Sequence, residues 1–174
     1  MTRRFKEGFG DAGGPSRAYV DTHYFLSVIF EEDVACDARR LFYSLQSRSY
    51  RVLVPQLVLG EINAKILEKT GVSELHDRFQ KYASVFSDYG IDHSCLPGVG
   101  RHVSRCMSDL LEVDDQIDPN DALIVSQVLA DPDSKFFFTN DTKMLDNQKI
   151  LGYEYELRKT DRRNTRLKII DWLD

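Results

Sequence analysis

The sequence predicts an α/β domain in which helices cover both faces of a mostly parallel sheet. Short apolar segments typical of strands alternate with longer segments in which apolar residues repeat at the helical period of 3.6. At 174 residues, the chain is long enough to bury a substantial core within one domain. Parallel strands joined by right-handed crossovers place their carboxyl ends at one edge. We therefore expect a three-layer α/β/α arrangement with candidate site residues at that edge.

The expected elements are separated by glycine, proline or capping residues, which mark helix ends and turns. In chain order we expect a strand at 17–21, helices at 24–30 and 33–46, a strand at 51–54, helices at 55–69, 73–89, 99–111 and 118–130, a strand at 135–139 and a short helix at 141–146. The two helices within about 72–114 carry apolar stripes that favour an inserted antiparallel pair. A single domain is thus expected over 17–174.

The composition is typical of a soluble globular protein. Hydrophobic residues make up 42% and charged residues 29% of the chain, without the long uncharged run of a membrane span. Residues 1–16 are glycine-rich and polar and lack the apolar stretch of a signal peptide, so we expect a flexible leader and a cytoplasmic location. The three cysteines lack zinc-type spacing and are expected to be reduced.

The end of the chain contains two segments of alternating polar and apolar residues, at 153–158 and 165–170. They predict a terminal hairpin, or an edge strand with its return. Basic residues in and around the intervening loop are candidate contacts for the phosphate backbone of a nucleic acid, although a merely solvated surface explains them too. These candidates are Arg158, Lys159, Arg162, Arg163 and Arg166. The net charge of −5 gives no general sign of nucleic-acid binding.

Four acidic residues occupy positions that the predicted sheet would bring together. Asp21 and Asp141 follow two strands, Asp121 lies in the first turn of a buried helix, and Glu61 borders the buried face of another helix. Four carboxylates at one point repel one another unless cations neutralise them. Mg²⁺ and Mn²⁺, which prefer oxygen ligands, suit this role and would polarise a phosphodiester and activate a water molecule.

Each acid also has a purely structural explanation. Asp118 is a good N-cap before Pro119, and acids near a helix N-terminus, such as Asp121 and Asp141, commonly cap free backbone N–H groups. For Glu61, an i,i+4 ion pair with Lys65 explains the residue as well as a site does. Considered one at a time, each of these acids is explained as well by capping or ion pairing as by metal binding.

The order and spacing of four short motifs resemble the PIN-domain ribonucleases, which include the VapC-type toxins. The motifs are Tyr19-Val20-Asp21-Thr22, Leu57-Val58-Leu59-Gly60-Glu61-Ile62, Asn120-Asp121-Ala122-Leu123-Ile124 and Thr139-Asn140-Asp141. They span Ala18 to about Leu151. The resemblance implies divalent-metal-dependent hydrolysis of single-stranded RNA that leaves a 5′-phosphate and a 3′-hydroxyl.

Carried over by position, the resemblance implies roles for seven residues. It makes Asp21, Glu61, Asp121 and Asp141 the catalytic, Mg²⁺- or Mn²⁺-binding acids, with Thr22, Thr139 and Asn140 supporting them. It implies RNA as substrate, and an antitoxin protein or a second copy of the chain as further partners. The leader, the long helix pair and the basic tail depart from a compact toxin and leave the toxin role open.

Two alternatives remain. A phosphatase of the haloacid-dehalogenase type would use Asp21 as nucleophile with a second acid two residues later, whereas Thr22 and His23 follow here. A PIN-like fold also serves as a non-catalytic module that binds RNA or docks a protein. Mn²⁺ binding that depends on Asp21 and Asp121 would separate the enzyme from such a module.

Overall fold

A five-stranded sheet in which all pairings are parallel forms the centre of the protein. The computed structural model describes residues 16–93, 99–160 and 162–171, so the predicted leader at 1–16 lies outside the described residues except for Ser16. The strands are β1 (Arg17–Val20), β2 (Arg51–Val54), β3 (Asp92–His93), β4 (Ser134–Phe138) and β5 (Lys168–Ile170), in the order β3-β2-β1-β4-β5. The predicted parallel sheet is confirmed, with β1 at its middle.

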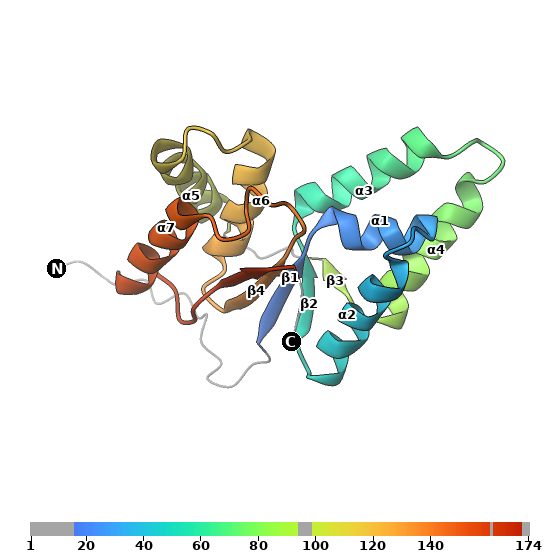
Figure 1. Cartoon of the computed structure of the whole chain (residues 1–174), viewed down its shortest axis with the longest axis horizontal. Coiled ribbons are helices and arrows are strands. Elements are labelled where there is room, and N and C mark those ends of the chain that lie inside the picture. The colour runs from blue at the N-terminus through green and yellow to red at the C-terminus, as the bar shows by residue number, and fades with distance from the viewer. Residues whose placement is uncertain (1–15, 94–98, 161, 172–174) are drawn as a thin grey trace.

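Helices lie on both sides of this sheet, which confirms the predicted three-layer arrangement. The helices form two groups, which Figure 1 shows on opposite sides of the sheet. The first group is α1 (Thr22–Phe30), α2 (Ala35–Ser47), α3 (Gln56–Lys69) and α4 (Leu75–Asp88), and the second is α5 (Val99–Val113), α6 (Pro119–Ala130) and α7 (Gln148–Lys159). Within the described ranges, no helix is long and apolar enough to cross a membrane.

The strands next to the sheet centre are apolar on both faces, as expected when helices cover both sides. In β1, β2 and β4, every residue from the second or third position onward is buried. The aromatic run Phe136-Phe137-Phe138 fills β4, and Phe138 pairs with Val20 of β1. This rigid centre fixes where the loops after β1 and β4 begin.

The predicted antiparallel helix pair at about 72–114 is wrong. Helix α4 packs against α1 and α3, whereas α5 packs against α6 and α7. The chain between them forms β3, which pairs with β2 through Leu53 and Asp92. The two helices therefore bury their apolar stripes on opposite sides of the sheet (Figure 1). An apolar stripe shows that a helix is buried, but it does not show which surface covers it.

Of the two alternatives predicted for the end of the chain, the edge strand is confirmed and the terminal hairpin is wrong. Residues 148–159 form helix α7, which Asn147 caps by accepting hydrogen bonds from the N–H groups of Lys149 and Ile150. Only β5 extends the sheet, as a parallel edge strand beside β4. Buried positions in α7 include Glu154 as well as apolar residues, so a charged residue interrupts the apolar period. That interruption conceals the helix in the sequence.

Candidate functional site

Asp21 stands at the middle of the sheet edge where the strands end. Its N–H donates to the carbonyl of Phe138 at 2.9 Å, which ties the start of α1 to β4. One carboxylate oxygen accepts from the N–H of Thr22 at 2.7 Å, and the other accepts from the hydroxyl of Thr139 at 2.7 Å. Asp21 is only 9% exposed. These bonds hold a largely buried carboxylate in one orientation.

Thr139 links the acid after β1 to the acid after β4. Its buried hydroxyl donates to Asp21 and accepts from the N–H of Asp141 at 3.1 Å. The Asp141 carboxylate accepts from the N–H of Lys143 at 2.8 Å, and residues 142–146 form turns in place of the short helix predicted at 141–146. Asn140, between them, is exposed.

Glu61 reaches the same region from α3. The hydroxyl of Thr22 donates a hydrogen bond to the Glu61 carboxylate, joining α3 to the start of α1. Lys65, the alternative partner, pairs with Glu68 at 2.7 Å instead. The local sequence therefore permits an ion pair that the structure does not use, and Glu61 faces the β1–α1 junction.

The two acids at the start of α6 have different surroundings. Asp118 is the N-cap, because its carboxylate accepts from the N–H of Asn120 at 2.8 Å and Pro119 takes the first helical position. The predicted cap is confirmed. The Asp121 carboxylate accepts no hydrogen bond from any residue that the structure describes. Of the acids at this edge, Asp121 is therefore the one for which hydrogen bonding gives no structural role.

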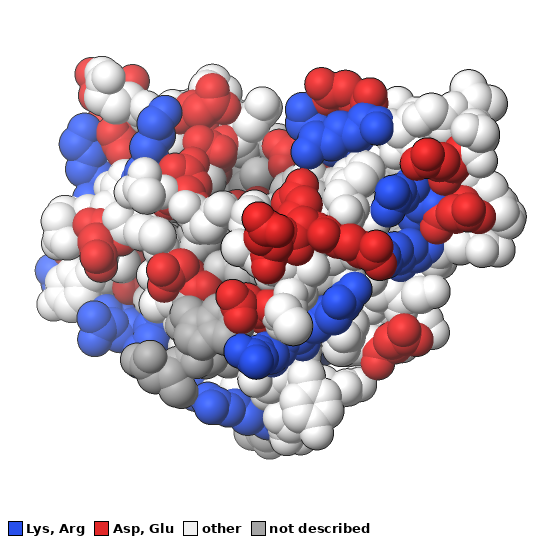
Figure 2. Space-filling view, turned by 45° about the vertical axis from the view of Figure 1, so that its right-hand side comes forward, with Lys and Arg blue, Asp and Glu red and all other residues white. Residues whose placement is uncertain are grey.

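The acids share one electrostatic environment. Burial and then the charges of Asp141, Asp118, Asp21 and Glu61 raise the pKa of Asp121 to about 6. Burial, with a contribution from Asp141, also raises the pKa of Asp21, while hydrogen bonds from Thr139 and Thr22 oppose this rise. Figure 2 shows acidic side chains around a hollow between the two helix groups. Motifs from four parts of the chain therefore converge.

The donor set suits a hard divalent cation, because carboxylate and hydroxyl oxygens are the ligands that Mg²⁺ and Mn²⁺ prefer. The ligands are not preassembled: among residues 16–93, 99–160 and 162–171, no three acidic, histidine or cysteine side chains form a group that could hold an ion. Each carboxylate has about four acceptor sites, so the bonded carboxylates of Asp21 and Glu61 keep free capacity. A cation would therefore have to draw some of these carboxylates closer together.

Asp114 is a residue at this edge that the sequence analysis missed. It is buried and accepts hydrogen bonds from Asn147 at 3.0 Å and from Lys149 at 2.9 Å. It thereby joins the loop before Asp121 to the loop after Asp141. In the sequence it begins an Asp-Asp-Gln run that is typical of a solvated turn, so no local signal indicates this role.

Arg163, one of the five candidate RNA-binding residues, is structural. Its side chain is fully buried, and its guanidinium donates to the backbone carbonyls of Val128, Leu129, Asp131 and Ser134 at 2.6 to 3.3 Å. The prediction that it contacts RNA is wrong. A guanidinium has five N–H donors in a fixed fork, which makes it able to bridge several carbonyls inside a protein.

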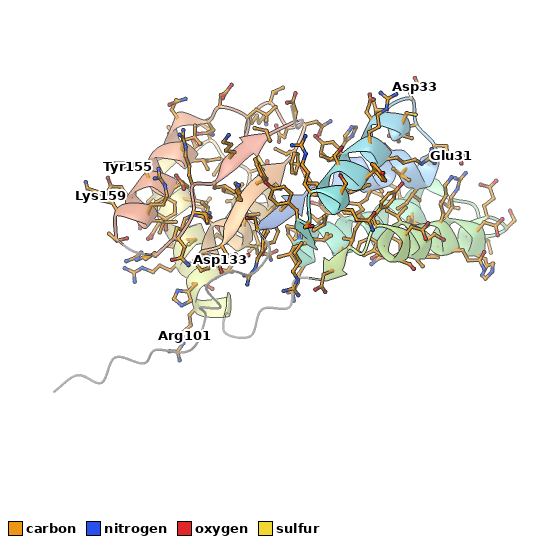
Figure 3. The ribbon with its side chains drawn as sticks, turned by 90° about the horizontal axis from the view of Figure 1, so that it is seen from below. Glu31, Asp33, Arg101, Asp133, Tyr155 and Lys159 are labelled. Atoms are coloured by element: carbon orange, nitrogen blue, oxygen red, sulfur yellow. The ribbon has the colours of Figure 1, made fainter. Side chains whose placement is uncertain are left out.

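The other four basic residues divide into engaged and free side chains. Arg158 donates to the buried carboxylate of Glu154 at 2.9 Å, and Lys159 lies 3.5 Å from Glu156. Figure 3 shows Lys159 and Tyr155 pointing away from α7. Arg162 and Arg166 are exposed and form no ion pair within the described ranges. Of the five basic residues predicted to contact RNA, Arg162 and Arg166 are therefore the ones most available to do so.

Comparison with known proteins gives a fold and no family. No protein-family model matches the sequence, and no curated protein matches it either. The fold is similar to a chain in the crystal structure of VapBC2 from Rickettsia felis bound to a DNA fragment from their promoter. The TM-score is 0.59 at 14% sequence identity, covering 90% of this chain and 99% of that chain. This similarity confirms the PIN-like α/β/α fold class.

Replacing Asp121 by Asn is expected to raise the free energy of unfolding of the metal-free protein by about 1 kcal/mol at pH 7. The folded chain holds the proton more tightly than the unfolded chain, since the pKa is about 6 instead of 3.8. This group's contribution to stability is therefore present below about pH 4 and lost as the pH rises through about 6. For a fully buried carboxyl group, this pKa shift would correspond to a gain of about 3 kcal/mol in the free energy of unfolding. The expected gain is smaller because solvent screens the charge of Asp121, which is partly exposed.

Urea denaturation in EDTA at pH 7 and near pH 4 measures this difference. The gain from Asp121→Asn should shrink toward zero at the lower pH. Asp33→Asn, at an exposed acid outside the site, is the matched control and should change neither value. An Asp121 variant that is less stable than the wild type at pH 7 would show that the acids do not repel one another.

Proposed function

We propose that the protein is a divalent-metal-dependent endoribonuclease that hydrolyses phosphodiester bonds of single-stranded RNA. The observation that carries this proposal is the convergence of Asp21, Glu61, Asp121 and Asp141 at one sheet edge. Burial, followed by the charges of the neighbouring acids, raises the pKa of Asp121, so the ionised cluster costs stability unless a cation binds. A costly cluster at the carboxyl edge of a parallel sheet is a functional-site signature.

In this proposal, Asp21 and Asp121 would hold the main ion, while Glu61 and Asp141 complete its shell or hold a second ion. The metal would supply Lewis-acid polarisation of the phosphodiester and a water of lowered pKa. The chain's own residues would do the positioning. Thr139 orients the Asp21 carboxylate and anchors the Asp141 backbone, as its hydrogen bonds indicate.

Thr22 and Asp114 support the same arrangement from its two sides. Thr22 donates through its N–H to Asp21 and through its hydroxyl to Glu61. Asp114 connects the segment before Asp121 to the segment after Asp141, through its bonds to Asn147 and Lys149. Such supporting groups commonly affect metal affinity or activity by about 10- to 100-fold.

Incubation with total RNA in Mn²⁺, followed by sequencing of the cut ends, tests this function. We expect endonucleolytic products with 5′-phosphate and 3′-hydroxyl ends, and no products in EDTA. Products with 2′,3′-cyclic phosphate ends that form equally well in EDTA would contradict the proposal, because the ribose hydroxyl would then be the nucleophile. Mapping the ends also identifies the preferred RNA target.

The second candidate function is a non-catalytic PIN-like module that binds RNA or docks a protein. The unassembled ligand set among the described residues favours it. Titration with Mn²⁺ distinguishes the two functions, since the nuclease requires saturable binding that weakens in Asp21→Asn and Asp121→Asn. A docking module would show no binding that depends on these residues.

The fold comparison extends the proposal to partners. The neighbouring structure contains VapBC2 bound to promoter DNA. By analogy we propose that this chain acts in the cytoplasm as a toxin, alone or as a homodimer, and that an antitoxin protein inhibits it. Co-expression with the product of an adjacent small reading frame, followed by co-purification and an RNA-cleavage assay, tests this relation.

A further inference from the structure

A basic pocket lies beside α5, α6 and α7, away from the acidic edge. Its volume is about 100 Å³, enough for several water-sized groups. Buried apolar groups of Cys106, Leu129 and Leu157 contribute to its walls. The exposed side chains of His102, Arg105 and Arg162 supply its nitrogen donors. The pocket therefore combines an apolar wall with donors from two separate segments.

Hydrogen bonds within the fold hold the pocket walls in place. The N–H of Arg162 donates to the carbonyl of Leu157 at 2.9 Å, which fixes the chain just after α7. The neighbouring residue, Arg163, is buried and donates to the carbonyls of Val128 and Leu129 at the end of α6. The loop that carries Arg162 is thus fastened to the α6 wall.

The arginines of this pocket have no ion-pair partner among the described residues, and the charge of Asp109 is the acidic one that acts on the pocket residue Cys106. Arg105 and Arg162 form no ion pair there, and the nearby acids have other partners. Asp109 accepts a hydrogen bond from Tyr153 at 2.7 Å, and Glu154 binds Arg158 at 2.9 Å. In a chain of net charge −5, two arginines that form no ion pair with any described residue stand out at one pocket. Charge complementarity indicates an anionic ligand.

We propose that the pocket formed by His102, Arg105 and Arg162 binds a phosphate group, carried by a free nucleotide or by an RNA chain. Guanidinium forks match phosphate oxygens in pairs, and a tetrahedral phosphate has enough oxygens for donors that approach from several directions. The acceptor sites of a carboxylate lie near one plane, so a carboxylate suits donors from several directions less well than a tetrahedral phosphate does.

This phosphate site is separate from the acidic site. Asp121 lies in the first turn of helix α6, near the acidic edge, whereas Leu129 and Ala130 end the helix beside the pocket. At 1.5 Å per residue, the backbone between these positions rises about 13 Å. The two sites share no residue, so a phosphate-binding test is independent of the proposed nuclease activity.

Isothermal titration of the full chain with inorganic phosphate, 5′-AMP and a short RNA tests the pocket. We expect saturable phosphate binding that weakens at least tenfold in the double variant Arg105→Gln, Arg162→Gln. The matched control, Arg39→Gln with Arg40→Gln, removes two positive charges at exposed positions that do not line the pocket and should leave the affinity within twofold. Titrations in EDTA keep metal-mediated binding at the acidic edge out of the measurement.

Comparison of the three ligands shows whether the bound phosphate belongs to a free nucleotide or to an RNA chain. Tighter binding of 5′-AMP than of the RNA, with the same dependence on Arg105 and Arg162, indicates a free nucleotide; the reverse order indicates an RNA chain. Absence of saturable phosphate binding, or equal weakening in both double variants, would overturn the proposal. Displacement of phosphate by an oligoglutamate peptide at equal concentration would overturn it in favour of an acidic protein partner.

Discussion

Asp21→Asn is expected to lower the rate of RNA cleavage in Mn²⁺ by roughly 10³-fold or more while the protein stays folded. The amide oxygen of Asn can still accept one of the bonds that Asp21 receives from Thr22 and Thr139. The variant therefore keeps most of the local geometry and loses the charge that a divalent cation requires. Single-turnover cleavage of a mapped RNA substrate measures the rate, and circular dichroism checks the fold.

Asp33→Asn provides the matched control, because it removes one exposed negative charge outside the site and should cleave at the wild-type rate. Asp121→Asn should lose activity to a similar extent, and it should also weaken Mn²⁺ binding. Loss of activity together with the expected gain in stability would show that the Asp121 carboxylate destabilises the metal-free protein and is required for cleavage. Wild-type cleavage by either site variant would refute the assignment of the metal ligands.

The acidic edge could be predicted because the sequence features that indicate it each lie within a few neighbouring residues. Asp21 and Asp141 directly follow apolar strand segments, and parallel strands bring such ends to one edge. Asp118 has the local pattern of an N-cap followed by proline, which leaves Asp121 free of that duty. Short-range patterns combined with one rule of topology were enough to bring these residues together.

The wrong predictions, the helix pair and the terminal hairpin with its basic loop, concern features that depend on residues distant in the sequence. Strand β3 has only two residues, so no periodicity in the sequence separates α4 from α5 and places them on opposite sides of the sheet. The burial of Glu154 depends on Arg158 and on Arg163, which lies nine residues away. Charged residues are mostly exposed, so the sequence alone favours a solvated basic loop at this place.

Arg163→Met is expected to lower the free energy of unfolding by about 3–5 kcal/mol, the largest stability effect that we predict. The substitution removes every hydrogen bond that the guanidinium donates to the carbonyls of residues 128–134. It also leaves Glu154, which is buried, with Arg158 as its only cationic partner among the described residues. Unpaired buried carbonyls and charges cost more than the methionine side chain regains by apolar contact.

Arg162→Met at the adjacent exposed position is the matched control, with an expected change within about 0.5 kcal/mol. Urea denaturation gives both values, and Arg163→Lys keeps the measurement possible if the methionine variant fails to fold. Lysine retains the charge but cannot reach four carbonyls in a planar fork, so its stability should lie between those of the wild type and Arg163→Met. If Arg163→Met were as stable as Arg162→Met and lost only RNA affinity, Arg163 would be an RNA contact after all. The geometry predicts the opposite: a cation that the sequence places in a basic loop serves to hold α6, β4 and the segment after α7 together.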